Sequence, residues 1–230
     1  NFVINDLSNW YVRRSRERVN LEVSDPKEIE DTLNTLYFVL IEYSKLLSPF
    51  IPFIAEEIYT NLTEEESVHL ADWPTPDELL IDNELEIDME KVRVLVEKVH
   101  AARKSENIKV RQPLSTLWID GLSEAERKRW FEYEELIKGE LNFKKIAYKA
   151  SLAKGDKLFK LSDGSVIELS ITPQLQAEGE ARDIVRKIQE ERKKIGTSLS
   201  EKVNVTLPTW PEEFESEIKR KALVKNLSKG

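Results

Sequence analysis

The strongest constraint on the fold is a set of apolar residues that recur every three or four positions between prolines. Asp25 precedes Pro26, and Glu28 follows three positions after the aspartate. This is the pattern of a helix N-cap, a proline in the first turn and an acid that reaches back to the cap. We therefore predict a helix that begins at Pro26 and ends before Ser48-Pro49, with an apolar stripe of Ile29, Leu33, Leu36, Tyr37, Leu40 and Leu47.

Similar stripes predict three more helices in the first half of the chain. One helix covers residues 1 to about 20, a second begins at Pro52, and a third covers Met89 to Lys104. The proline-containing, acidic stretch between Thr63 and Asp88 reads as a long surface connection. Four helices of this length bury their stripes most simply against one another. We therefore predict a mainly α protein whose residues 1–108 form an antiparallel helix bundle.

After Asn107 the pattern changes to short alternating segments mixed with helices, typical of a small α+β domain over 109–230. Asp163-Gly164 favours a tight hairpin turn between two strands, and Gly196 favours the end of a helix. We see no internal repeat. The expected strands are 115–120, 143–150, 157–161, 165–171 and 203–207, and the expected helices are 124–140, 172–195 and 212 to about 225.

Composition excludes several classes of site. The chain has 230 residues with no cysteine and two isolated histidines, which excludes disulfides, thiolate nucleophiles and histidine or cysteine metal sites. No apolar run is long enough to cross a bilayer and no secretory leader is visible, so we expect a cytoplasmic protein without a membrane partner. The first residue is Asn1 and the only methionine is Met89, so we expect a piece of a longer chain.

Catalytic and cofactor motifs are also missing from the sequence. No glycine-rich loop precedes a helix in the way that a phosphate cradle requires, and the histidines lack a nearby nucleophile. Acidic pairs such as Glu56-Glu57 read as solvated helix faces. The formal charge of −8 argues against nucleic acid only on average, because phosphate binding depends on local clusters of lysine and arginine.

Five segments in fixed order resemble the anticodon-binding and C-terminal region of isoleucyl-tRNA synthetases. The helical bundle segment LSPFIPFIAEEIY and the SVHLADWP segment are shared with related class I synthetases, those for valine and leucine included. The NDLSNWYVRRSR and KVRQPL segments point to the isoleucine enzyme. The segments are residues 5–16, 47–59, 67–74, 109–114 and 181–189 (ARDIVRKIQ), and together they span nearly the whole chain.

This resemblance implies a module that recognises the anticodon arm of isoleucine tRNA. The HIGH and KMSKS signatures of the family are absent, so ATP, Mg²⁺ and the aminoacylation and editing chemistry would belong to a catalytic part outside this chain, which is then a partner. The chain departs from the family at Arg18, which leads into Val19-Asn20-Leu21 without an aromatic residue. It also lacks the cysteines of a bacterial-type zinc module, so its ending resembles the archaeal and eukaryotic type.

Helical phase selects the residues that we expect to contact tRNA. At 100° per residue, Asn5, Asn9, Arg13 and Arg16 form one stripe, separate from Val3, Leu7, Trp10 and Tyr11, which we expect to face the core. Arginine binds phosphate and stacks on bases, and asparagine can read base edges. Arg14 and Arg18 share the core-facing line, so we expect them to support the fold. Arg103, Lys104, Lys109 and Arg111 form a second expected tRNA-binding cluster.

Three other interpretations stay open. The basic residues between Arg182 and Lys194 alternate with acids, which favours a self-paired, solvated surface. The whole chain could also be an acidic helical scaffold that binds another protein, or the equivalent region of a valyl- or leucyl-tRNA synthetase. A hydrolase has almost no support among the residues.

Overall fold

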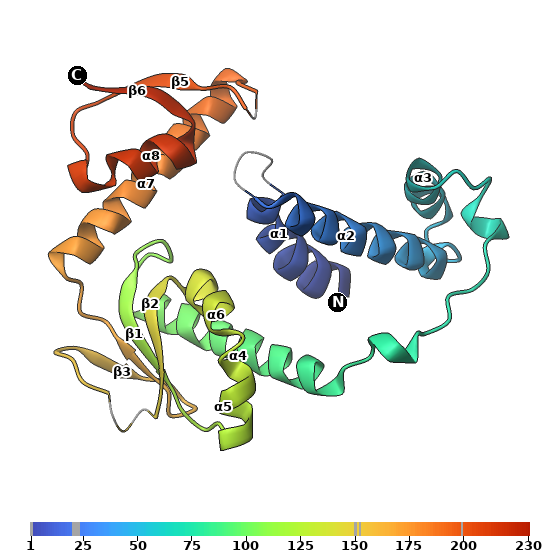
Figure 1. The fold of residues 1–230 in the computed structure, drawn as a ribbon, viewed down its shortest axis with the longest axis horizontal. Helices are drawn as coiled ribbons and strands as arrows, with labels where there is room; N and C mark the ends of the chain where they lie inside the picture. Colours follow the sequence, from blue (N-terminus) through green and yellow to red (C-terminus); the bar gives the residue numbers. More distant parts are fainter. Residues whose placement is uncertain (1, 20–23, 150, 152, 199) are drawn as a thin grey trace. The chain divides into compact units, whose positions relative to one another are not determined.

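The computed structural model describes residues 2–19, 24–149, 151, 153–198 and 200–230, and shows a mainly helical chain with two small β-sheets (Figure 1). Backbone contacts divide it into two compact units, Asn1–Ile81 and Asp82–Gly230. The sequence predicts a division after residue 108. The difference concerns the long helix α4 (Asn83–Ser105), which belongs to the second unit and was expected to be the fourth member of the bundle.

The first unit consists of helices alone. Its elements are a π-helix, η1 (Phe2–Val12), that continues directly into α1 (Arg13–Arg18), followed by α2 (Pro26–Leu47), α3 (Pro52–Leu62) and the short 3₁₀ turns η2 (Val68–Leu70) and η3 (Glu78–Leu80). The predicted helix starts at Pro26 and Pro52 are confirmed, and the Asp25 carboxylate accepts a hydrogen bond from the Lys27 amide. The ends predicted at residues 1 and 20 lie outside the described residues.

Side-chain hydrogen bonds join elements of this unit. The Tyr11 hydroxyl donates to the Thr32 carbonyl at 3.0 Å, which ties η1 to α2. Glu56 on α3 accepts from the Ser67 hydroxyl at 3.0 Å and the Val68 amide at 2.8 Å, so this carboxylate holds the η2 turn. The prediction of Glu56 as a solvated surface acid is therefore wrong, because a neighbouring turn presents it with two donors.

The second unit begins with α4 and a four-stranded sheet. After α4 come β1 (Leu114–Ile119), α5 (Glu124–Trp130), α6 (Glu134–Leu141), β2 (Phe143–Tyr148), β3 (Leu158–Lys160) and β4 (Val166–Glu168). The strand order is β2-β1-β4-β3, with β1 and β2 parallel and the other pairs antiparallel. The predicted hairpin at Asp163-Gly164 is confirmed as the turn between β3 and β4. The end predicted at Ala150 lies outside the described residues.

The chain then forms a second, smaller sheet. Helix α7 (Pro173–Ile195) is followed by β5 (Val203–Leu207), the 3₁₀ turn η5 (Glu212–Phe214), α8 (Glu215–Ala222) and β6 (Val224–Lys229). Strands β5 and β6 are parallel and lie beside α8 (Figure 1). Val203 and Val205 pack with residues of α7 and α8. The predicted stop of α7 at Gly196 is confirmed, because this glycine caps the helix with φ of 73°.

These two halves of the second unit repeat one substructure, which corrects the expectation of no internal repeat. Helices α4 and α7 each have 23 residues. Each is followed by a strand, a short helical segment (α5 or η5), an 8-residue helix and a strand parallel to the first. The 8-residue helices end in the same left-handed conformation, at Asn142 (φ 54°, ψ 50°) and Leu223 (φ 54°, ψ 49°). The amides of Leu114 and Val203 donate to the carbonyls of those two capping residues at 2.9 and 3.0 Å.

An arginine near the end of each long helix makes the same bonds. Arg103 donates to the carbonyls of Lys109 and Gln112, and Arg192 donates to those of Ser198 and Glu201, at identical sequence spacing. The two long helices also share sequence at this register: Arg93, Val96, Lys98, Arg103 and Lys104 of α4 align with Arg182, Val185, Lys187, Arg192 and Lys193 of α7. Beyond the helices the repeat is visible in backbone conformation alone.

Two further sequence predictions are wrong in detail. The helix predicted over 124–140 is broken between Trp130 and Glu134, and the helix predicted to reach Lys225 ends at Ala222 and gives way to β6. Both breaks lack glycine and proline. The left-handed residue that ends α8 is a leucine, which carries no local signal for such a turn.

Candidate nucleic-acid interface

The predicted RNA-facing stripe of the first helix is exposed. Asn5, Asn9, Arg13 and Arg16 all lie on the surface, and the Arg13 Nε–H donates to the Asn9 carbonyl at 2.8 Å. Arg16 makes no ion pair with any residue that the structure describes. Because η1 is a π-helix, its turns contain more residues than the 3.6 assumed for the stripe, yet Asn5 and Asn9 still fall one turn apart. These amides and guanidinium groups can meet phosphate and base edges.

The arginines between them lie in a different environment. Arg14 is half-buried with its guanidinium 5.1 Å from the centre of the Trp10 ring, and Arg18 lies 5.8 Å from the Tyr11 ring. Arg18 also donates to the Ser15 hydroxyl at 3.3 Å and lines a groove with the acids of α2. Cation–π contact and partial burial attach both arginines to the fold. Of the four residues expected in the core, Leu7 is buried, Trp10 and Tyr11 are half-buried, and Val3 is exposed.

Arg103, which we expected to contact tRNA, lies in the interior of the second unit. Its guanidinium is completely buried and donates to the carbonyls of Leu141 at 2.7 Å, Gln112 at 2.8 Å and Lys109 at 3.2 Å. It also lies 5.3 Å from the centre of the Phe143 ring. Burial lowers the pKa of Arg103 to about 10, which leaves it protonated at neutral pH. Arg103 is therefore a structural cation that holds the loop after α4 against β2.

The loop held by Arg103 presents the other three expected residues to solvent. Lys104, Lys109 and Arg111 are all exposed. Lys109 pairs with Asp183 of α7 at 2.7 Å, and Arg111 lies 3.6 Å from the second oxygen of the same carboxylate. The hydrogen bond from Lys109 lowers the pKa of Asp183. The sequence predicts Asp183 as one of the acids of a self-paired helix surface and does not predict its pairing with Lys109, because nothing local indicates that an acid so distant in the chain neutralises this loop.

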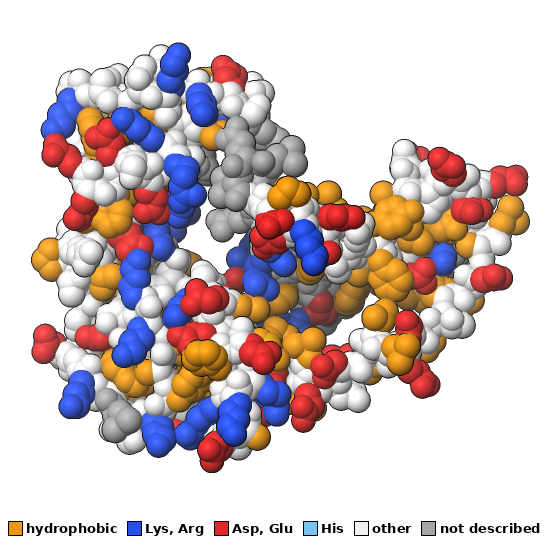
Figure 2. Space-filling view, in the orientation of Figure 1, with side chains coloured by type: hydrophobic (Ala, Val, Ile, Leu, Met, Phe, Trp, Pro, Cys, Tyr) orange, Lys and Arg blue, Asp and Glu red, His pale blue; other side chains and the backbone are white. Residues whose placement is uncertain are grey.

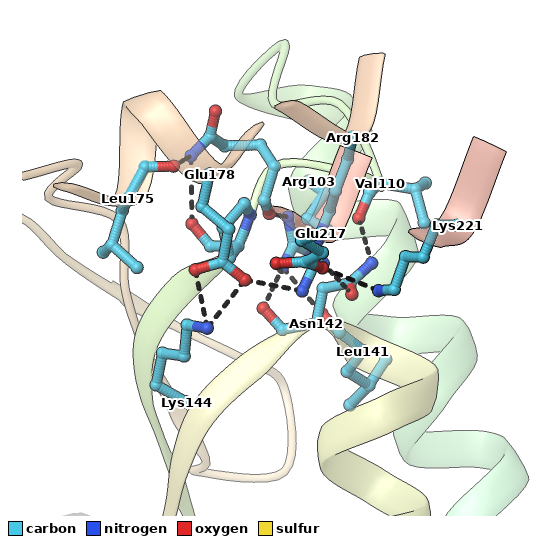
Figure 3. A network of polar contacts seen from close by, with 12 residues as sticks. Arg103, Val110, Leu141, Asn142, Lys144, Leu175, Glu178, Arg182, Glu217 and Lys221 are labelled. Atoms are coloured by element: carbon cyan, nitrogen blue, oxygen red, sulfur yellow. Dashed lines mark hydrogen bonds and ion pairs between the residues drawn. The ribbon is translucent and has the colours of Figure 1, made fainter. Parts of the chain in front are cut away.

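The first half of α7 is joined to the same loop and to β2 by polar contacts (Figure 3). Arg182 donates to the Asn142 side chain and pairs with Glu178 at 2.7 Å, and Lys144 pairs with Glu178 at 2.6 Å. Gln112 donates to the Leu175 carbonyl at 2.7 Å. Arg186 and Lys194 pair with glutamates on the same helix. The prediction of a largely self-paired basic surface on α7 is confirmed for these residues.

The arrangement suits recognition by contact. Within the described residues no cluster of histidine and acid side chains could hold a metal ion, and no helix is long and apolar enough to cross a membrane. Acidic and basic side chains are interspersed over the surface in Figure 2. The exposed cations that lack an acidic neighbour are the groups most available to phosphate.

Comparison with known proteins points to one family. A family model described as the anticodon-binding domain of tRNA ligase matches residues 1–117. An isoleucine–tRNA ligase of Pyrococcus abyssi is 33% identical over 282 residues, which cover 94% of this chain and 26% of that protein. One of Dehalococcoides mccartyi is 35% identical over 86% of this chain and 20% of its own length, and one of Protochlamydia amoebophila is 42% identical over 66% and 15%.

The chain spans about a quarter or less of the length of these relatives. The matched region includes the exposed stripe of η1 and α1 and also the loop that Arg103 holds. The family model covers more than half of the chain, and the similarity to the isoleucine-specific enzymes extends through both units. This chain belongs to the anticodon-binding domain family of tRNA ligases.

Proposed function

We propose that this chain recognises the anticodon arm of isoleucine tRNA as a region of an isoleucine–tRNA ligase. In this proposal, ATP, Mg²⁺ and the chemistry of aminoacylation belong to another part of the enzyme, and this region contributes binding energy and selects the tRNA. The observation that carries the proposal is the exposed stripe Asn5, Asn9, Arg13 and Arg16 on the first helix, inside the region that matches the anticodon-binding family.

Charge and contacts support two different roles for the arginines of this helix. The net charge of −8 repels RNA as a whole, so binding has to depend on local cations. Arg13 and Arg16 are exposed, whereas Arg14 and Arg18 rest on aromatic rings. We therefore assign phosphate or base contact to the first pair and support of the helix to the second. In this proposal Lys104, Lys109 and Arg111 form a second surface that contacts the tRNA. Arg103 is not part of that surface, because its side chain is buried.

Four single alanine variants test this assignment. We expect Arg13→Ala and Arg16→Ala to weaken binding of an isoleucine tRNA anticodon stem-loop by roughly 1 to 3 kcal/mol each, the value of a charge-assisted contact, without a change in melting temperature. Arg14→Ala and Arg18→Ala should lower the melting temperature first. Affinity is measured by fluorescence anisotropy at two salt concentrations, because phosphate-led binding weakens steeply with salt.

The reverse pattern would overturn the assignment. If Arg14→Ala and Arg18→Ala lose affinity with unchanged melts while the other two melt early, the RNA face is the opposite one. A stem-loop from valine tRNA is the matched ligand, since equal affinity for both RNAs would contradict the proposed isoleucine specificity. Unchanged affinity across the salt range would contradict phosphate-led recognition.

One observation favours a protein-binding role for part of the first unit. Phe50, Phe53 and Ile54 around the start of α3 are 78, 88 and 60% exposed, and hydrophobic side chains gather over α2 and α3 in Figure 2. Exposed apolar groups of this size usually contact another protein surface. If Phe50→Ser and Phe53→Ser leave anticodon stem-loop affinity unchanged but abolish association with the rest of the ligase, the surface serves the enzyme's own assembly. The scaffold interpretation would replace tRNA binding only if no stem-loop bound at low salt.

A further inference from the structure

The repeated substructure of the second unit is complete in its first copy and open in its second. In the first copy, the edge of β1 that faces away from β2 is paired with β4, which is antiparallel and places Ile167 opposite Leu117. Val166, Ile167 and Leu169 of that hairpin are buried. In the second copy, β5 takes the place of β1, and within the described residues its sheet contains only β5 and β6.

The free edge of β5 carries backbone groups for a further strand. The Val203 amide donates to Leu223, and the Leu207 carbonyl accepts from Gly230, so these residues direct their backbone groups toward β6. Because backbone direction alternates along a strand, Asn204 and Thr206 direct theirs toward the open edge. An unpaired edge of this kind is a template for another strand.

A groove with a volume of about 320 Å³ lies along this edge. It is lined by β5 and by residues of α7, including Lys187, Ile188 and Ile195. Ile195 is 70% exposed, an unusual position for an isoleucine beside an open strand. The groove therefore offers apolar surface next to unpaired backbone groups, which is the combination that a β-strand fills.

The first copy shows which side chains fasten the hairpin in place. Lys98 of α4 pairs with Asp163 at the hairpin turn at 3.0 Å, and Glu106 just beyond α4 pairs with Lys157 at 2.9 Å. By the spacing that relates Arg103 to Arg192, the counterparts of Lys98 and Glu106 are Lys187 and Ile195. Lys187 makes no ion pair with any described residue, and it lines the groove.

We propose that the edge of β5 binds an antiparallel β-hairpin supplied by another polypeptide segment, in the position that β3 and β4 occupy in the first copy. The chemistry of that hairpin follows from the groove. The side chains of the hairpin that face the groove are apolar. An acidic residue near its turn pairs with Lys187, as Asp163 pairs with Lys98 in the first copy. At the position that Lys157 has in the first copy, the hairpin has an apolar residue, which covers Ile195. Backbone hydrogen bonds to Asn204 and Thr206 supply the remaining affinity, as in other cases of strand addition.

A fusion to the full chain tests this proposal. Residues 150–171 of the chain itself are appended after Gly230. The appended hairpin is then separated from β6 by as many residues as β3 is separated from β2. Because the hairpin is attached to the chain, its effective concentration at the edge of β5 is high. We expect amide exchange of Asn204 and Thr206, measured by NMR, to slow by at least about tenfold on strand pairing. The appended segment supplies copies of Asp163 and Lys157. Lys187→Glu should therefore reverse the protection, and Ile195→Glu should increase it by restoring the second ion pair.

The matched control is the same fusion with the copies of Val166 and Ile167 changed to aspartate, which should leave both amides fast. The two substitutions at Lys187 and Ile195 should leave the exchange of the unfused chain unchanged, because Lys187 makes no ion pair with a described residue and Ile195 is exposed. Three results would overturn the proposal: slow exchange of Asn204 and Thr206 in the unfused chain, no effect of the fusion, or protection that rises with protein concentration. The last result would assign the edge to a second copy of this chain. The test does not depend on tRNA binding.

Discussion

Replacing Arg103 with methionine separates a structural role from an RNA-binding role at one residue. The substitution keeps a long apolar stem and removes the charge together with the donors to Leu141, Gln112 and Lys109. The Leu141 carbonyl lies in the interior, whereas the other two belong to a loop that water reaches. A bond from a charged donor contributes about 1.5 to 3 kcal/mol when its partner is left unsatisfied, and less where water replaces it.

The net effect follows from these contacts. Counting the Leu141 bond fully and the loop bonds at about 1 kcal/mol each gives a loss of roughly 4 kcal/mol. Removing a cation that burial disfavours, as its lowered pKa indicates, returns roughly 1 to 3 kcal/mol, so we expect Arg103→Met to lower the free energy of unfolding by roughly 1 to 3 kcal/mol. Urea unfolding followed by the fluorescence of Trp118 and Trp130, both buried in the same unit, measures the loss.

Its neighbour provides the control. Lys104 is exposed and makes no ion pair within the described chain, so Lys104→Met should change the free energy of unfolding by less than about 0.5 kcal/mol. Arg192→Met in the second copy should lose less than Arg103→Met, because Arg192 holds two carbonyls, those of Ser198 and Glu201. The structural role of Arg103 is refuted if the free energy of unfolding of Arg103→Met lies within about 0.5 kcal/mol of that of the parent chain and the variant loses anticodon stem-loop affinity instead.

Three further predictions each concern one residue: Asp183, Glu126 and Gly196. Asp183→Asn removes the carboxylate that neutralises Lys109, so anticodon stem-loop affinity should rise, most at low salt; an unchanged affinity in anisotropy titrations would exclude this loop from the interface. The hydrogen bond from Lys91 lowers the pKa of Glu126 to about 2. The contribution of the ionised Glu126 to stability should therefore be complete above the pKa of a glutamate in the unfolded chain, about 4.3, and should disappear as pH falls toward 2. Glu126→Gln should flatten the melting temperature over that interval, and an unchanged pH profile would contradict the assignment. Gly196→Ala should cost about 1 kcal/mol in urea unfolding through its positive φ alone, because an added Cβ meets nothing within 4 Å; a neutral result would show that α7 can end elsewhere.

Parts of the candidate interface could be predicted from the sequence, and parts could not. The exposure of Asn5, Asn9, Arg13 and Arg16 agrees with the stripe predicted from helical phase, whereas Val3, which the same phase assigns to the core, is exposed in the π-helix η1. The burial of Arg103 does not, because an arginine looks the same in sequence whether its guanidinium meets water or the carbonyls of residues far along the chain. The neutralising acid Asp183 was invisible for the same reason.

The sequence by itself determined the features that depend on neighbouring residues. Asp25 with Pro26 starts α2, Asp163-Gly164 turns the β3–β4 hairpin, and Gly196 ends α7, because capping, turn geometry and positive φ are decided within a few residues. Even the family is recognisable from short segments. These signals are local, so they survive without knowledge of the packing.

Only the tertiary structure decided which elements belong together. The stripe of α4 fits a bundle as well as a sheet. The contacts of α4 with α6, and the hydrogen bonds of Asp88 with Arg129 and Trp130, join the helix to the second unit. The left-handed turn at Leu223, and with it β6, depends on packing that favours a conformation leucine rarely adopts. The repeat was missed because its sequence match is confined to the second half of each long helix, whereas backbone hydrogen bonds preserve the rest of the substructure with different side chains.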